Sequence, residues 1–261
     1  MAVATPEAPI ALLSALPQEQ GGLVDLLEHV LPAVRHAGRD FIRGRLGGRP
    51  VVLALCGIGK VAAAATTAVL IERFGIAQLV FTGVAGGLGP FVDVGDVVVA
   101  DGFLQHDMDA SPLFPRHEIP SYGRSVFDAD VDLADALEHA SRAALATPHR
   151  LYEAEDAVRF GLHRTKVHRG LVASGDRFVS AAPEAAALRA SVPAALAVDM
   201  ESAAVAQVCH DYRVPFAAVR TISDRADDSA HVDFPAFVEI VASRYAHAIV
   251  KTMFAPDRRL I

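Results

Sequence analysis

Cysteine is scarce in this sequence: its 261 residues contain only Cys56 and Cys209, and there is no CxxC pair. Two distant cysteines exclude a disulfide framework and a zinc knuckle, and they are typical of a reducing compartment. The first residues, MAVATPEAP, lack the basic segment and apolar stretch of a secretory signal. We therefore expect a cytoplasmic protein.

Long hydrophobic runs are also missing, although 52% of the residues are hydrophobic. Glycine, proline or a charged residue interrupts each run well before the roughly 18–20 residues that a membrane helix needs. The composition therefore predicts a large core and no membrane partner. An excess of positive charge is absent too, because the net charge is −7, which argues against a nucleic-acid partner. No repeat or low-complexity tract divides the chain, so we expect one domain over residues 1–261.

Three apolar runs end abruptly at acids. Residues 10–16 (IALLSAL) lead to Glu19, residues 196–198 lead to Asp199 and Glu201, and residues 216–222 lead to Asp224. Such runs are typical of buried parallel strands, and open α/β folds bind ligands at the carboxyl edge of the sheet. The alanine-rich segment 202–211 predicts a crossover helix, so the strands on either side of it should be parallel near neighbours. These acids should then share one cleft.

The remaining patterns alternate between strands and helices. At least six strand candidates separated by helices predict a three-layer α/β domain. The segment 147–168, the most charged of the chain, is interpreted as a solvated face or an extra hairpin. Besides the runs above, we expect a helix over 23–31, a hairpin over 34–48, strands at 51–55, 78–81, 94–100 and 170–174, and helices over 60–74, 128–145, 183–190 and 234–254.

The glycines of residues 57–62 (GIGKVA) match the dinucleotide-binding fingerprint loosely. That fingerprint needs an acid at the end of the next strand, but Thr82 and a second glycine-rich turn, 83–89, stand there, so a nucleotide cofactor is disfavoured. The sequence His-Asp-Met-Asp at 106–109 lacks a distant second histidine, which favours loop hydrogen bonding over a metal site. Three prolines in residues 111–123 predict an ordered lid or a subunit contact.

Seven features occur in the order and spacing of the 5'-methylthioadenosine/S-adenosylhomocysteine nucleosidases, which the chain therefore resembles over nearly its whole length. They are Glu19, CGIGKV (56–61), TGVAGG (82–87), VGDVVVAD (94–101), ASGDRFV (173–179), VDMES (198–202) and RTISD (220–224). The resemblance implies a nucleoside phosphorylase-like α/β/α sandwich with a mixed, mostly parallel sheet. It also implies a role in methionine salvage, with no cofactor and no metal.

The resemblance also implies roles for individual residues. Asp224 is similar to the general acid that protonates adenine N7, Glu19 to the carboxylate that activates water, and Glu201 to the residue that holds the ribose hydroxyls. Phe178 resembles the ring that stacks on adenine. The main chain of Val179 resembles the one that hydrogen-bonds the edge of the base. Arg220 matches a residue of the water site. Three residues match a loop that covers the 5'-substituent across a homodimer: Leu113, Phe114 and Pro120. Further substrate-binding positions are Met200, Ala85, Gly86 and Ser223.

The chemistry of the residues agrees with hydrolysis. Cleavage of an N-glycosidic bond needs one protonated and one ionised carboxyl group, and burial separates the pKa values of such a pair. Related phosphorylases need donors for a phosphate dianion, but Phe81 and Val84 stand at the equivalent positions. We therefore expect water as the nucleophile. An aminodeoxyfutalosine nucleosidase, a phosphate-dependent phosphorylase and a binding module without turnover remain the alternatives.

Overall fold

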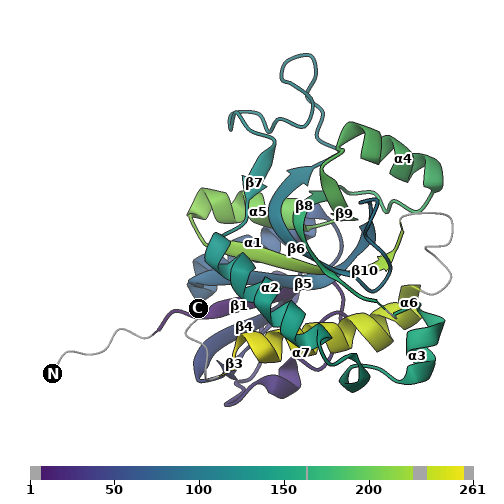
Figure 1. Ribbon diagram of the computed structural model, residues 1–261. Coiled ribbons are helices and arrows are strands. Elements are labelled where there is room, and N and C mark those ends of the chain that lie inside the picture. Colours follow the sequence, from purple (N-terminus) through teal and green to yellow (C-terminus); the bar gives the residue numbers. More distant parts are fainter. Residues whose placement is uncertain (1–6, 163, 226–233, 256–261) are drawn as a thin grey trace.

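The computed structural model describes residues 7–162, 164–225 and 234–255. Its strands form one continuous mixed sheet, with helices on both faces (Figure 1). The strands are β1 (Ile10–Ser14), β2 (Val34–His36), β3 (Arg39–Leu46), β4 (Arg49–Leu55), β5 (Gln78–Gly87), β6 (Val97–Gln105), β7 (Val126–Asp128), β8 (Val167–Ser174), β9 (Ala195–Asp199) and β10 (Phe216–Asp224).

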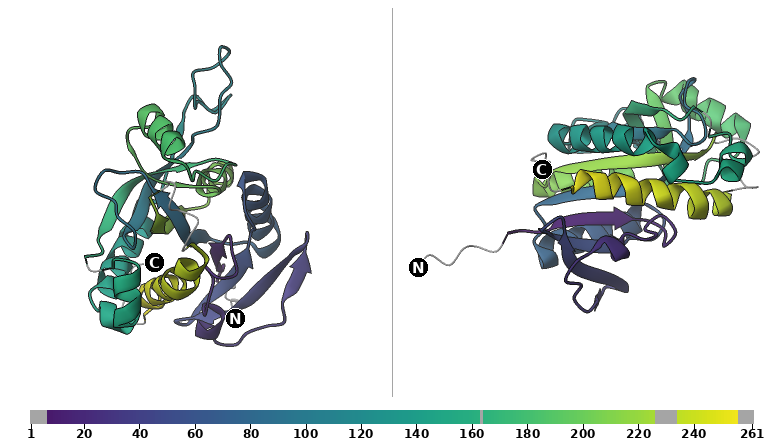
Figure 2. Two further views of the ribbon diagram at one scale, coloured as in Figure 1. Left: turned by 90° about the vertical axis from the view of Figure 1, so that its right-hand side faces the viewer. Right: turned by 60° about the horizontal axis from the view of Figure 1, so that its bottom comes forward.

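The helices make the two outer layers of the α/β/α sandwich, which confirms the predicted fold class. Helices α2 (Val131–Leu145) and α7 (Ser243–Met253) pack together on one face, and α1 (Lys60–Phe74) and α5 (Ser202–Tyr212) on the other (Figures 1 and 2). The remaining helical segments are η1 (Val24–Leu26), η2 (Pro148–Arg150), α3 (Ala154–Arg159), α4 (Ala182–Ser191), α6 (Phe234–Phe237) and the π-helical turn η3 (Val238–Ala242). Within the described residues, no helix is long and apolar enough to cross a membrane.

The sheet has two parallel groups, β4-β1-β5-β10 and β6-β8-β9, which meet where β10 pairs antiparallel with β6. The prediction that β9 and β10 are parallel neighbours is wrong. Strand β10 lies between β5 and β6, whereas β9 pairs with β8 and, antiparallel, with the end of β5. The ends of β9 and β10 still meet, because Gly86 of β5 is the partner of both Val198 and Asp224.

Several predicted boundaries change for the same reason, namely backbone pairing that is distant in the sequence. The glycine turn after residue 81 continues β5 to Gly87, since β10 and β9 pair with it. Strand β6 continues past a bulge at Asp101 to Gln105, paired with β8. The helix expected over 23–31 shortens to η1, because Glu28 and Leu31 donate backbone hydrogen bonds to Arg45 and Arg43 of β3.

The charged segment 147–168 forms neither a hairpin nor a purely solvated face. It folds into η2 and α3 before β8 begins, and four of its apolar side chains are buried: Leu151, Tyr152, Phe160 and Leu162. The ring of Phe160 packs edge-on against Phe237, with centroids 5.4 Å apart. The hairpin over 34–48 and the helices α1, α2, α4 and α5 lie close to their predicted ranges, and the single helix predicted over 234–254 consists of α6, η3 and α7 in succession.

Candidate active site

A cavity of about 290 Å³ opens where β1, β5, β9 and β10 end. This volume lies near the lower end of the range for small-molecule pockets. Of the residues predicted for the site, nine line the cavity: Glu19, Ala85, Gly86, Phe178, Val179, Met200, Glu201, Ser223 and Asp224. The acids from three strand ends, 205 positions apart at the extremes (19 and 224), therefore meet at one place.

Glu19 is held by the main chain. Its Oε2 accepts hydrogen bonds from the backbone N–H groups of Ala15 (2.9 Å) and Leu16 (2.8 Å), and its Oε1 accepts one from Val84 (3.0 Å). Burial raises the pKa of Glu19, while the nearby Arg220 guanidinium and these three N–H groups oppose that rise. The carboxyl group is thus fixed in orientation at the cavity wall.

Glu201 lies at the start of α5, with 6% of its surface exposed. Its Oε1 accepts a hydrogen bond from the backbone N–H of Gly59 at 2.9 Å. Burial, and then the neighbouring Asp199 carboxylate, raise the pKa of Glu201 to about 7. The pKa of Glu201 therefore lies close to neutral pH.

The Gly59 turn explains why glycines follow the strand β4. Gly59 has φ +98°, and a Cβ there would lie 3.1 Å from Asp176 Oδ1. Asp176 accepts the backbone N–H of Lys60 at 2.7 Å, while Lys60 Nζ donates to Asp107 at 2.6 Å. The sequence predicts this turn only as a place of close packing. In the structure its backbone also donates a hydrogen bond to Glu201, and Asp176 and Asp107 hold the adjacent Lys60. In segment 106–109, Asp107 accepts hydrogen bonds from Lys60 and from the backbone N–H of Asp176, and Asp109 accepts one from that of Ser111, as predicted for a hydrogen-bonded loop.

Asp224 ends β10, with 6% of its surface exposed. The hydroxyl of Ser223 donates to Asp224 Oδ2 at 2.7 Å, which orients the carboxyl group. On another wall, Phe178 is 41% exposed, and its ring meets Phe234 edge-on with centroids 5.9 Å apart. The cavity thus combines an exposed aromatic face with four acids, the three described above and Asp199.

Arg220 does not line the cavity, contrary to its predicted place at the water site. Its side chain is 1% exposed and donates to Asp199 (Nε to Oδ2, 2.8 Å) and to Ser202 Oγ (2.7 Å). Its guanidinium also lies over the ring of Phe81, 3.9 Å from the centroid. Only a glycine fits opposite it, because a Cβ at Gly83 would lie 2.2 Å from Arg220 Nη1. Arg220 is therefore a buried cation behind Glu19.

Asp199 lines the cavity, as expected for an acid of the cleft, but no role was predicted for it. It accepts hydrogen bonds from Ser174 Oγ (2.5 Å), from the backbone N–H groups of Glu201 and Ser202 (both 3.2 Å) and from Arg220. It thereby caps the N-terminus of α5 and fixes Glu201 beside the cavity. An acid two residues before Glu201 was a usable signal. Other missed lining residues are Ala15, Leu16, Ile58, Val84, Arg177, Val198 and Phe234.

The three predicted loop residues do not line this cavity. Leu113 is 84% exposed, Phe114 and Pro120 are partly exposed, and the loop that carries them projects from the body near β7 (Figures 1 and 2). Within the described residues, no group of three or more His, Cys, Asp or Glu side chains could hold a metal ion.

Comparison with known proteins places this site in a class. A family model described as the phosphorylase superfamily matches residues 9–255, and the chain belongs to that superfamily. The chain is 35% identical to a 5'-methylthioadenosine/S-adenosylhomocysteine nucleosidase from Bacillus thuringiensis, over 94% of this chain and 97% of that one. It is therefore a member of the 5'-methylthioadenosine/S-adenosylhomocysteine nucleosidases.

Solved structures agree. The nucleosidase from Neisseria meningitidis in complex with methylthio-immucillin-A matches with a TM-score of 0.81 and 34% identity, over 94% of this chain and 98% of that one. The futalosine hydrolase of Helicobacter pylori also matches, with a TM-score of 0.78 and 29% identity, over 94% of this chain and 96% of that one. The neighbours thus include two kinds of nucleoside hydrolase.

Proposed function

We propose that this protein hydrolyses the N-glycosidic bond of 5'-methylthioadenosine and S-adenosylhomocysteine, releasing adenine. The observation that carries the proposal is the meeting of Glu19, Glu201 and Asp224 at one cavity that also exposes Phe178. Family membership supports it, since the relatives above are named for this activity. We also propose a role in methionine salvage, which the resemblance implies and which rests on the thioribose product released together with adenine.

In the proposed reaction, Asp224 donates a proton to N7 of adenine while the bond from C1' to N9 breaks. Glu19 takes a proton from the water that adds to C1', and Glu201 holds the ribose hydroxyls. Such general acid and base assistance contributes about 10²–10⁴-fold each. The ring of Phe178 stacks on the base, whose edge meets the main chain of Val179. The donors to Glu19 and the Ser223 hydroxyl on Asp224 support these orientations.

Water, and not phosphate, is the proposed nucleophile. Val84 brings an alkyl side chain to the cavity, and its backbone N–H is already bonded to Glu19. Phe81 is fully buried beneath Arg220. Neither side chain can donate to a phosphate dianion, which needs charged or strongly polar donors.

An adenine-release assay without phosphate, run on a panel of nucleosides, tests the proposal. We expect turnover of methylthioadenosine and adenosylhomocysteine, and a loss of about 10²–10⁴-fold in kcat for Asp224→Asn with substrate binding retained. Aminodeoxyfutalosine belongs in the panel because a futalosine hydrolase is among the structural neighbours. Turnover by Asp224→Asn at the wild-type rate contradicts the assignment of the acid, and adenine release only with phosphate contradicts hydrolysis.

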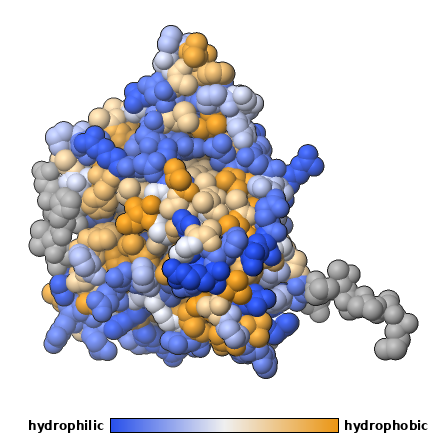
Figure 3. All heavy atoms as spheres, turned by 180° about the vertical axis from the view of Figure 1, so that it is seen from behind, coloured by the Kyte–Doolittle hydropathy of each residue, from blue (hydrophilic) through white to orange (hydrophobic). Residues whose placement is uncertain are grey.

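We further infer a cytoplasmic homodimer of single-domain chains. One continuous sheet supports a single domain over residues 1–261, and two free, buried cysteines suit a reducing compartment. The projecting 111–123 loop does not reach its own cavity, so it is free to cover that of a second copy. Hydrophobic residues also gather on the face seen in Figure 3, and the turn before α1 and its first residues expose Ile58 (59%) and Val61 (80%). Light scattering tests the dimer.

A further inference from the structure

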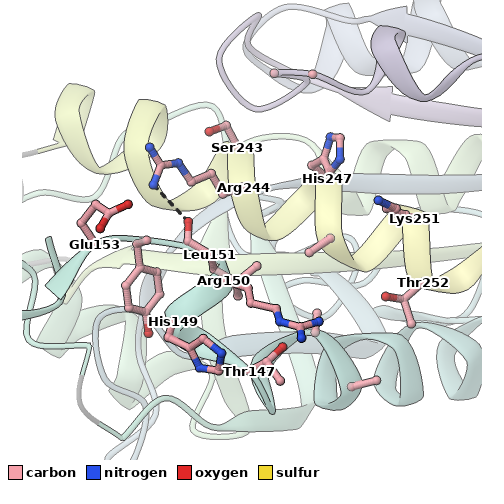
Figure 4. A pocket seen from close by; sticks show the side chains of 16 residues that line it. Thr147, His149, Arg150, Leu151, Glu153, Ser243, Arg244, His247, Lys251 and Thr252 are labelled. Atoms are coloured by element: carbon pink, nitrogen blue, oxygen red, sulfur yellow. Dashed lines mark hydrogen bonds between the residues drawn. The ribbon is translucent and has the colours of Figure 1, made fainter.

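A second, larger groove of about 760 Å³ lies between α7, the end of α2 and the segment 147–153 (Figure 4). The turn at Gly21 and Gly22 contributes to its wall, and Gly22 lies beside His247, since a Cβ there would be 3.2 Å from His247 Nδ1. No described residue lines both this groove and the acid-lined cavity. The groove is therefore separate from the proposed active site.

Basic side chains dominate this groove. Arg150, Arg244 and Lys251 are cations at neutral pH, His149 and His247 lie among them, and Glu153 is the single acid in its lining. Arg150 comes from η2, whereas Arg244 and Lys251 come from α7, so cations face the groove from two walls (Figure 4). This local excess of positive charge runs against the net charge of −7 of the whole chain.

The fold does not need these charges for its own ion pairs. Among the described residues, none of the groove's cations is paired with an acid, and Arg244 donates only to the carbonyl of Leu151 at 3.1 Å. By contrast, Arg142 of the neighbouring α2 pairs with Glu138 at 2.7 Å. The helix dipole accounts for a cation at Lys251, near the end of α7, but not for the others.

The rest of the lining suits a compact anion. Two hydroxyl groups, from Thr147 and Thr252, add hydrogen-bond donors between the cations, whereas the hydroxyl of Ser243 donates to the carbonyl of Glu239. The apolar part consists mainly of alanines, and Tyr152, the one phenol ring of the lining, is 6% exposed. The other rings are the imidazoles of His149 and His247, which lie among the cations. Guanidinium and ammonium groups converging with hydroxyl groups are the donors that phosphate oxygens prefer.

We propose that this groove binds a compact, multiply charged anion of the phosphate class, such as a short polyphosphate. Arg150, Arg244 and Lys251 hold the charges from two sides, and the hydroxyl groups of the lining orient the oxygens. The site is independent of the adenine-releasing reaction, because it shares no described residue with the acid-lined cavity.

Isothermal titration calorimetry with sodium tripolyphosphate at low ionic strength tests the proposal. We expect saturable binding by the wild type, weaker by about tenfold in Arg150→Gln and in Lys251→Gln, and lost in the double variant, since a charge-assisted contact contributes about this factor. The matched control is Arg189→Gln, an exposed cation on α4, far from the groove. Both groove residues are exposed, so their variants should fold normally.

A second measurement uses only the wild-type chain. Tripolyphosphate at saturation should slow acylation of Lys251, followed by mass spectrometry, at least tenfold more than it slows acylation of Lys166, which is exposed elsewhere. Three outcomes overturn the proposal: no binding by the wild type, equal weakening by Arg189→Gln, which marks general screening, or displacement of tripolyphosphate by methylthioadenosine, which marks binding at the acid-lined cavity.

Discussion

Asp199 and Glu201 are two residues apart and equally buried, yet their surroundings differ. Protein groups satisfy the hydrogen-bonding capacity of the Asp199 carboxylate: two hydroxyl groups, two backbone N–H groups and the Arg220 guanidinium donate to it. Glu201 receives one hydrogen bond from the described residues, that of Gly59, and it faces the cavity. A buried acid that is fully bonded holds the fold together, whereas one with acceptor capacity left at a cavity can bind a ligand.

The same contrast separates Arg220 from the acids in front of it. Arg220 is a buried cation whose partners are all protein groups, so its effect on Glu19 is electrostatic and positional. Glu19 and Asp224, in contrast, present carboxyl groups to the cavity after the main chain and Ser223 have oriented them. Asp199 and Arg220, whose partners are protein groups, form a lower layer that supplies stability. Glu19, Glu201 and Asp224 form an upper layer that supplies the proposed chemistry.

Replacing Arg220 tests the lower layer and should have the largest effect on stability. Arg220→Met leaves the Asp199 carboxylate buried without its cation, which lowers the free energy of unfolding by about 3–5 kcal/mol. Urea denaturation measures this loss. The control is Arg169→Met, whose ion pair with Glu138 is partly exposed, and which should cost less than about 1 kcal/mol. Equal losses in both variants contradict the distinction.

Replacing Glu201 tests the upper layer through pH. The pKa of Glu201 rises from 4.5 to about 7 on folding, so the folded state binds the proton more tightly than the unfolded state. Its contribution to stability is therefore most favourable below about pH 4.5 and is lost as the pH rises through about 7. Glu201→Gln removes this dependence and should be more stable than the wild type at pH 8 by about 1–3 kcal/mol.

Urea denaturation of Glu201→Gln at pH 5 and pH 8 measures this gain, which should shrink at the lower pH. Gln can still accept the Gly59 hydrogen bond through its amide oxygen. Glu155→Gln, at an exposed position of α3, is the control and should follow the wild type at both values. Parallel pH curves for the wild type and Glu201→Gln contradict the raised pKa.

The smallest effect is expected outside both layers, at the projecting loop. Leu113→Ala should leave stability unchanged, because the side chain is 84% exposed. If the loop covers the cavity of a second copy, the KM for a 5'-alkylthio nucleoside should rise by up to about tenfold, from lost apolar contact. Steady-state assays of Leu113→Ala and of Val158→Ala, an exposed control on α3, measure the difference. An unchanged KM in an active dimer contradicts the covering role.

Most of the cavity could be predicted from the sequence. Local composition shows where apolar runs stop at Glu19, Glu201 and Asp224, and the motif order identified Phe178 and Val179 as neighbours of the site. The misses share one cause. Arg220 lies within the last strand, four residues before Asp224, and only its distant partners, Asp199 and Ser202, show that its side chain points beneath the cavity.

The sequence by itself determined most elements of this protein and the acids at their ends, because apolar periodicity and helix starts depend on neighbouring residues. The tertiary structure alone decided that β9 and β10 run in opposite directions and still meet at Gly86, and that α7 and η2 bring cations to one groove. Strand pairing and side-chain contacts of this kind join residues far apart in the chain. Their geometry depends on the packing of the whole sheet and its helices, which no local pattern contains.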